Sequence, residues 1–263
     1  MRRVAIIGHG AIGRDLAGAL AARDGYALAI VLRPGSASAA AVDPACAVLH
    51  DEAALARFAP ALVVEAAGAG AVRDWGPAVL GLGVPLLLSS VGALHDDALH
   101  QHLVAAAQAA GTRLYLPSGA LAGLDYVRAA RGAPNLRVRY ESRKPPAAWA
   151  DELARLGRAA APDSAVTLFE GHARDAAARY PANLNVAATL ALAGAGFEET
   201  GVRVVADPAA PGNTHTIRVT SDLGDLALTV ANRPSPDNPK TSWIVSRALL
   251  AAVEQHFSTV VML

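Results

Sequence analysis

The chain has 263 residues, of which 53% are hydrophobic and 17% charged, and its basic and acidic side chains are equal in number. This hydrophobic content is too high for a disordered protein, and the length suits one large α/β domain or two smaller ones. No apolar run approaches the ~20 residues that span a bilayer, and no basic excess indicates a nucleic-acid partner. We therefore expect a soluble globular protein that binds a small molecule or a second copy of itself.

The residue types that carry redox and metal chemistry are sparse. Cys46 is the single cysteine, so it cannot form an intramolecular disulfide, and the N-terminus lacks the apolar stretch of a signal peptide. Both features favour a cytoplasmic protein. No two histidines have the i, i+4 spacing of a metal site, so we predict no metal. Only Lys144 and Lys240 are lysines among the basic residues, which makes them candidates for positions that need a compact ammonium group.

Short aliphatic runs alternate with amphipathic segments through the first 120 residues. Strands buried on both faces are continuously apolar, so this pattern predicts parallel βαβ units. The expected strands are residues 3–7, 27–32, 47–49, 61–65, 85–88 and 113–115, and the expected helices lie near 11–23, 51–57, 70–81 and 95–110. We predict an α/β fold whose N-terminal part is a doubly wound (Rossmann) parallel sheet.

The pattern changes after Pro117. Five segments alternate apolar and polar residues, as strands do in a sheet with one solvated face: 136–142, 165–171, 201–207, 214–220 and 225–231. Helices are expected near 183–195 and 241–255, the second after a loop of Pro, Asn, Asp and Ser over 232–239. These features predict an α+β second domain with an open mixed or antiparallel sheet.

A glycine motif directly follows the first expected strand and opens the first helix. In Gly8-His9-Gly10-Ala11-Ile12-Gly13, the first glycine permits a tight turn, the second lets the backbone approach a pyrophosphate, and the third allows close helix–strand packing. The helix N-terminus supplies N–H groups to the anion. We predict a dinucleotide site, with a merely tight turn as the alternative. The candidate cofactor-binding residues here are Gly8, Gly10, Ala11, Ile12 and Gly13.

The end of the second strand bears on the choice between NAD and NADP. An acidic residue about 20 positions after the motif would bind the ribose 2′-hydroxyl of NAD, but here Leu32 is followed by Arg33. Arg33 is expected either to pair with a 2′-phosphate or to be an exposed loop charge that stacks on adenine. The predicted cofactor is therefore NAD or NADP.

Five further clusters lie outside the nucleotide half: PSGALAGLD, RKPP, FEGHARDAAARYPANLNVAATLALAG, NTH and NPKTS. In this order, after the N-terminal glycines, they resemble the L-aspartate dehydrogenase family over nearly the whole chain. The resemblance implies a homodimeric oxidoreductase that oxidises aspartate at Cα with NAD or NADP. The iminoaspartate formed would hydrolyse to oxaloacetate and ammonia or enter NAD biosynthesis. The family's catalytic histidine falls on His215 and its nicotinamide contacts on Ala120 and Asn185, while His9 departs from the smaller residue commoner in the phosphate loop.

The residues themselves support a role for His215. Oxidation of an amine carbon requires the ammonium to lose a proton, and hydrolysis of the imine requires an activated water; an imidazole suits both tasks. His215 lies at an expected strand start beside Asn213 and Thr214, which could orient the ring or the substrate. A structural histidine with satisfied hydrogen bonds is the alternative.

The two carboxylates of the substrate need cationic or N–H partners. Lys240, Thr241 and Ser242 lie at an expected helix start, where the dipole and the hydroxyls would attract an anion. Lys144, next to Arg143 and two prolines, is the second candidate. For each lysine the alternative is a surface salt bridge.

These assignments give two predicted domains. Residues 1–120 form the dinucleotide-binding domain, on which the C-terminal helix in 236–263 is expected to pack, and residues 121–235 form the substrate, catalytic and dimerisation domain. Two other functions remain open: a cyclic-imine reductase of the dihydrodipicolinate reductase type, and a non-catalytic NADP-sensing protein. The reductase alternative lacks support, because the site of such reductases resembles two adjacent histidines followed by a lysine, and this sequence has no such motif.

Overall fold

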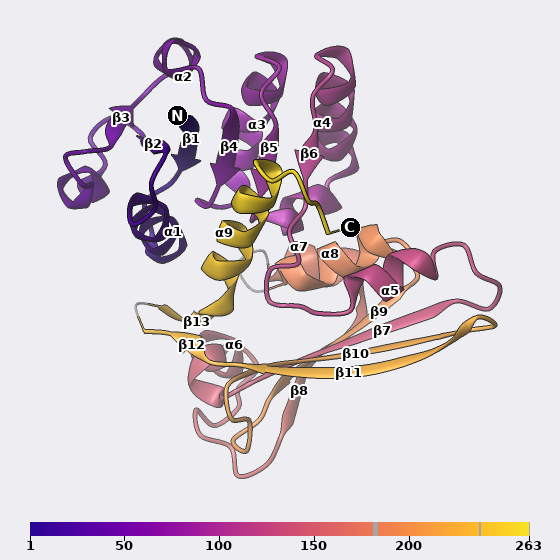
Figure 1. The fold of residues 1–263 in the computed structure, drawn as a ribbon. Helices are drawn as coiled ribbons and strands as arrows, with labels where there is room; N and C mark the ends of the chain where they lie inside the picture. Colours follow the sequence, from indigo (N-terminus) through magenta and orange to yellow (C-terminus); the bar gives the residue numbers. More distant parts are fainter. Residues whose placement is uncertain (181–183, 237, 263) are drawn as a thin grey trace. The chain divides into compact units, whose positions relative to one another are not determined.

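The structure, a computed structural model, describes residues 1–180, 184–236 and 238–262, with only the backbone at 239 and 240. Its contacts divide the chain into unit 1, Met1–Gly119 with Val245–Leu263, and unit 2, Ala120–Ile244. Each unit is described by itself (Figure 1). The functional domain bounds given above stay a prediction. None of the helices in the described part is long and apolar enough to cross a membrane.

Unit 1 contains a six-stranded sheet in the order β3-β2-β1-β4-β5-β6. Its strands are all parallel: β1 Arg2–Ile7, β2 Tyr26–Val31, β3 Ala47–Leu49, β4 Leu62–Glu65, β5 Leu86–Leu88 and β6 Leu114–Tyr115. The helices are α1 Ala11–Ala21, α2 Glu52–Phe58, α3 Ala69–Gly81 and α4 Asp97–Ala109, with 3-10 turns η1 Ala37–Ala41 and η2 Val91–His95. The predicted doubly wound parallel sheet is confirmed. The strand order reverses at β1 and β4, and ligands bind such sheets beyond the carboxyl ends of these strands.

The core of unit 1 explains why the apolar runs form the sheet. Val4, Ile6 and Ile30 are completely buried, as expected for strands covered on both faces. Helix α9, Ile244–His256, adds Leu249 and Val253 to the same cluster. The C-terminal segment is therefore part of the hydrophobic core of this unit.

Unit 2 contains a five-stranded sheet in the order β11-β10-β7-β9-β8. The strands are β7 Arg137–Lys144, β8 Val166–His172, β9 Thr200–Ala206, β10 Asn213–Ser221 and β11 Gly224–Asn232. β7 and β9 run parallel and the other neighbours antiparallel, so the predicted open mixed sheet is confirmed. A separate pair is formed by β12 Pro234–Ser235 and β13 Asn238–Ser242.

Helices cover one face of this sheet. They are α5 Leu124–Ala129, α7 Ala173–Arg179 and α8 Asn185–Ala193, which lie along the same side in Figure 1, while η3 Pro146–Trp149 and α6 Ala150–Arg155 follow β7. Only α8 was predicted, because the other helices span at most two turns and show little periodicity. On β7 every second residue is buried, from Val138 to Lys144, as the alternation predicted.

The prediction that Lys240, Thr241 and Ser242 begin a helix is wrong. Their backbone is extended in β13 and pairs antiparallel with β12, and α9 begins only at Ile244. The physical reason is the antiparallel pairing of β13 with β12, in which Ser242 lies opposite Pro234 and the backbone is held extended. The expected loop over 232–239 accordingly contains β12 and the start of β13, and no helix N-terminus lies at Lys240 to attract an anion.

Candidate functional site

The turn after β1 has the geometry of a phosphate-binding loop. Gly8 has a φ of +96°, and a Cβ there would lie 2.7 Å from Ala67 Cβ. A Cβ on Gly13 would lie 2.3 Å from the Gly8 carbonyl oxygen. Gly10, in contrast, has no heavy atom within 4 Å of its Cβ position. The first and third glycines are thus required by packing, and the second leaves open space where a pyrophosphate can approach the backbone.

The N-terminus of α1 supplies donors to that space. Its first intrahelical bond runs from the Arg14 N–H to the Gly10 carbonyl at 2.9 Å, so the amides of Ala11, Ile12 and Gly13 have no intrahelical acceptor. Gly10 contributes no side-chain cap, and the first turn contains no acidic residue. The loop residues therefore fit a dinucleotide cofactor, with N–H groups and the helix dipole directed at its anionic part.

Glu65 holds the neighbouring loops in place. It is completely buried at the end of β4, and one carboxylate oxygen accepts the N–H groups of Ala67 and Gly68 at 2.7 Å each. The Ser90 N–H at 2.9 Å and hydroxyl at 3.0 Å complete four hydrogen bonds. Glu65 thereby joins the ends of β4 and β5 and sets Ala67 against Gly8. A carboxylate at the end of an apolar strand was the available sequence signal, but Glu65 was not predicted to hold these loops.

His9 and Arg33 differ in exposure. His9 is 7% exposed, and burial lowers the pKa of its imidazole against the opposing effect of a hydrogen bond to the Ser38 backbone. His9 therefore connects the phosphate loop to η1. Arg33 is exposed in the loop that follows β2, so both interpretations of it stay predictions.

A second group of polar side chains lies on the buried face of the unit 2 sheet. Three belong to alternate positions of β7, from its middle to its end, and two to the start of β10, where His215 pairs in register with Ser142. All are at most 3% exposed: Tyr140, Ser142, Lys144, Asn213 and His215. The alternation of both strands brings together two predicted substrate residues and the predicted catalytic histidine, with Tyr140 and Ser142 in addition.

The imidazole of His215 is held by Tyr140. The phenol oxygen and Nδ1 share a hydrogen bond of 2.7 Å, and the rings stack with an interplanar angle of 15°. Nε2 is buried and has no hydrogen-bond partner among the described residues. Burial, and secondarily the charge of Lys144, lower the pKa of His215 to about 3, so the ring is neutral at physiological pH. Sequence reasoning did not single out Tyr140, although the alternation in RVRYESRK places it on the face of Lys144.

Lys144 and Asn213 lie beside this pair. The Lys144 side chain is 3% exposed, which rules out a surface ion pair, and its ammonium lies 5.2 Å from the Trp149 ring centroid. Asn213 donates to the Ser242 hydroxyl at 3.2 Å, which connects β10 to β13. Asn213 therefore contacts Ser242, and the residue that holds the His215 ring is Tyr140.

Four further predicted positions lie in unit 2. Ala120 is 6% exposed and its carbonyl accepts from the Asn232 side chain at 2.9 Å, while Asn185 is the half-buried first residue of α8. Thr241 is half-buried on β13, but the side chain of Lys240 lies outside the described part, as do residues 181–183 of the PANLN motif.

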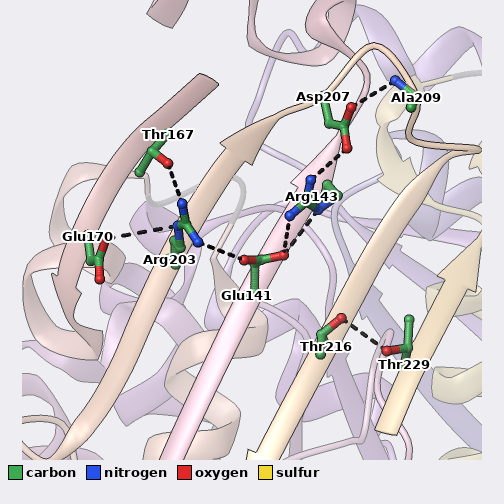
Figure 2. A network of polar contacts seen from close by, with 9 residues as sticks. All are labelled: Glu141, Arg143, Thr167, Glu170, Arg203, Asp207, Ala209, Thr216 and Thr229. Carbon is green, nitrogen blue, oxygen red and sulfur yellow. Dashed lines mark hydrogen bonds and ion pairs between the residues drawn. The ribbon is translucent and has the colours of Figure 1, made fainter. Parts of the chain in front are cut away.

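The opposite face of the sheet is lined by ion pairs. Arg143 contacts Asp207 at 2.6 Å and Glu141 at 2.8 Å, and Arg203 lies 3.6 Å from the other Glu141 oxygen (Figure 2). A hollow of about 910 Å³ lies over this face. This hollow lies on the side of the sheet away from the His215 ring, so the volume of a hollow does not by itself identify the catalytic site.

Within the described residues, no three His, Cys, Asp or Glu side chains are grouped to hold a metal ion, and the prediction of no metal stays a prediction.

Comparisons with known proteins agree with both units. Residues 125–256 match the family described as "Aspartate dehydrogenase, C-terminal", and residues 8–117 match "Homoserine dehydrogenase, NAD binding domain". The chain is 46% identical to L-aspartate dehydrogenase 2 of Bordetella bronchiseptica over 97% of each chain. It is 39% identical to the L-aspartate dehydrogenase of Brucella anthropi, over 98% of this chain and 97% of the relative. The aspartate dehydrogenase structure from Thermotoga maritima shares the fold, with a TM-score of 0.76 and 24% identity over 100% of this chain and 99% of that one.

The packing of Gly13 makes a prediction about the phosphate loop. Gly13→Ala is expected to destabilise unit 1 by about 1–3 kcal/mol and to weaken dinucleotide binding, because its Cβ would collide with the Gly8 carbonyl. Gly18→Ala is the matched control on the same helix: nothing lies near its Cβ position, so it should stabilise by up to about 1 kcal/mol. Thermal unfolding and calorimetric titration with NAD and NADP measure both effects. Equal behaviour of the two variants would contradict the proposed loop geometry.

Proposed function

The chain belongs to the L-aspartate dehydrogenase family, and from this premise we propose that it oxidises L-aspartate to iminoaspartate with NAD or NADP. Water then converts the imine to oxaloacetate and ammonia. The observation that carries this proposal is a neutral, buried His215 beside the buried cation Lys144, in a chain whose first unit has a dinucleotide loop. Relatives named L-aspartate dehydrogenase support the substrate.

The cofactor, when bound, supplies the acceptor for the hydride that leaves Cα of the substrate. Toward it, the loop of Gly8, Gly10 and Gly13 with the amides of Ala11 and Ile12 is proposed to hold the pyrophosphate. Ala120 and Asn185 are proposed to contact the nicotinamide end. Arg33 is proposed to lie at the adenosine ribose, where its charge tolerates the 2′-phosphate of NADP.

His215 is proposed as the catalytic base. Nε2 takes a proton from the substrate ammonium, which frees the nitrogen lone pair to form the C=N bond as the hydride departs. Once this proton has passed to solvent, the same nitrogen takes a proton from the water that adds to the imine carbon and returns it to the amine, which leaves as ammonia. A buried imidazole without a partner at Nε2 is ready to accept such protons.

Lys144 is proposed to bind a carboxylate of the substrate and, through it, to control His215. Burial, and secondarily the repulsion between the Lys144 charge and a proton on the ring, lower the pKa of the imidazole, which makes His215 a weak base. A carboxylate paired with Lys144 cancels that repulsion and raises the basicity of the ring. The base is thus strengthened when its substrate is present. Asn213, Thr241, Ser242 and Lys240 are proposed as further donors to the dicarboxylate.

The chain is proposed to act in the cytoplasm as a homodimer. Cys46 is a free thiol, which suits a reducing compartment. The product iminoaspartate is proposed to enter NAD biosynthesis when it is not hydrolysed. Residues 1–120 with the C-terminal helix are proposed as the cofactor-binding domain, and residues 121–235 as the domain for substrate and dimerisation.

The role of His215 is tested by kinetics. With aspartate and NAD or NADP at alkaline pH, the wild-type protein should form reduced cofactor, measured by its near-ultraviolet absorbance. His215→Ala should lower kcat about 10²- to 10⁴-fold through loss of the base, and the exposed His172→Ala on β8 should leave kcat unchanged. Cofactor binding without any turnover by the wild type would favour the NADP-sensing protein, and turnover only with cyclic imines would favour the reductase.

The role of Lys144 is tested by Lys144→Met, which keeps the length of the side chain and removes its charge. KM for aspartate should rise at least about 10-fold, because a charge-assisted hydrogen bond to a carboxylate is lost. Arg143→Met, on the opposite face of the same strand, is the control and should leave KM within about 2-fold. An unchanged KM in Lys144→Met would remove Lys144 from the substrate site.

Dimerisation is proposed to occur through the face drawn in Figure 2, where arginine and glutamate side chains alternate and a two-fold related copy would present the same charges. Multi-angle light scattering at micromolar concentration should give twice the chain mass. Thr229→Arg, on β11 at this face, should shift the protein toward monomer, and Val104→Arg on the exposed side of α4 should not. A monomeric wild type would disprove the dimer.

A further inference from the structure

Tyr140 lies on β7 directly against the imidazole of His215. It is 2% exposed at the middle of β7, and its phenol oxygen lies 2.7 Å from His215 Nδ1. Burial raises the pKa of the phenol far above its usual range, so Tyr140 stays protonated and uncharged at physiological pH. A neutral phenol can either donate its hydrogen to Nδ1 or accept the hydrogen of Nδ1–H. The direction of this one bond decides which imidazole nitrogen carries the lone pair.

The surroundings of the pair favour Tyr140 as the acceptor. If the phenol donated to Nδ1, the neutral ring would carry its hydrogen on Nε2, which is buried and has no partner among the described residues. A buried N–H without an acceptor is rarer and costlier than a buried acceptor without a donor. If Nδ1–H donates to the phenol instead, only an acceptor lone pair is left at Nε2.

The phenol hydrogen also has a place to go. Ser142, two residues along the same face of β7, interacts with the Tyr140 phenol. Its hydroxyl oxygen is buried and completes no hydrogen bond within the described part of the chain. A hydroxyl oxygen that receives no other donor can accept from Tyr140 while Tyr140 accepts from His215, which gives the imidazole hydrogen and the phenol hydrogen one acceptor each.

We propose that Tyr140 is a positioning residue for His215: its phenol oxygen accepts the Nδ1–H of the imidazole and thereby keeps the Nε2 lone pair free for the substrate. This inference rests on the proposed function, in which His215 is the base. When Nε2 takes a proton, the ring becomes an imidazolium, and the Nδ1–H bond to Tyr140 becomes charge-assisted and stronger. Tyr140 thus stabilises the protonated base without losing its own proton. The titratable groups that face His215 among the described residues are Tyr140 and Lys144.

The tautomer is measured directly in the wild-type protein by nitrogen NMR of the histidine rings, with His215 assigned by its absence in His215→Ala. The expected spectrum shows a protonated Nδ1 and an unprotonated Nε2 that do not change between pH 6 and 8, since the ring is neutral throughout this range. A protonated Nε2 in the wild type would overturn the proposal without any variant.

Tyr140→Phe is the kinetic test, since it keeps the ring and removes the oxygen. We expect kcat for aspartate to fall about 10- to 100-fold, KM to change less than about 2-fold, and the preference for Nδ1–H to be lost in the NMR spectrum. The acidic limb of the pH profile of kcat should move to lower pH, because the imidazolium loses the charge-assisted bond that stabilises it and the pKa of His215 therefore falls. A limb that stays in place or moves to higher pH would contradict the proposal.

Tyr180→Phe is the matched control. Tyr180 is 6% exposed in the same unit and donates to Glu152 at 2.8 Å, so loss of its hydroxyl also deletes a partly buried phenol hydrogen bond. It should lower stability to a similar degree and leave kcat and the His215 spectrum unchanged. Equal losses of kcat in both variants would reduce Tyr140 to a structural residue and overturn the proposal.

The catalytic role of His215 and the positioning role of Tyr140 are tested by different outcomes. If His215→Ala keeps the wild-type kcat, the catalytic role of His215 fails, whatever Tyr140→Phe does. If His215→Ala is inactive while Tyr140→Phe retains full kcat and the Nδ1–H tautomer, only the positioning role of Tyr140 is overturned.

Discussion

On β7 and β10 every second side chain faces the covering helices, and the candidate catalytic site depends on this alternation. It places Tyr140, Lys144 and His215 on the buried face and sends Glu141 and Thr216 to the other. Because the side-chain period of a strand is two, a register shift of one residue would exchange the two sets. The antiparallel register of β7 and β10, which pairs His215 with Ser142, therefore holds the polar groups together.

Burial shifts the pKa values of these groups in opposite directions, because it favours the neutral form of each. Desolvation keeps the His215 ring neutral and keeps the Tyr140 phenol protonated, while the ammonium of Lys144 adds to the cost of charging the ring. A low local dielectric strengthens each of these interactions. An anionic ligand would reverse part of the balance, since it would offset the Lys144 charge and favour the imidazolium. The charge of an anion bound beside Lys144 would thus be coupled to the basicity of the histidine.

The glycine loop of unit 1 shows a different constraint, which is steric. Gly8 and Gly13 approach each other so closely that no side chain fits, and the buried carboxylate of Glu65 holds the adjacent backbone through four hydrogen bonds. Rigid packing on one side of the loop leaves Gly10 open on the other. In both units, polar groups are placed at strand ends by a framework of buried apolar residues.

The sequence by itself determined the parallel and mixed sheets, most strand bounds to within two residues, the glycine loop and the candidate His215, because these depend on local periodicity and on motifs that are contiguous in the chain. It did not reveal Tyr140 as the partner of His215 or Glu65 as the link between two loops, since these contacts join residues from different strands. It also misassigned Lys240–Ser242 to a helix start, where pairing with β12 imposes an extended backbone. Only the tertiary structure decided which buried polar groups meet, because hydrogen bonds between strands depend on register, and register is set by the packing of the whole sheet.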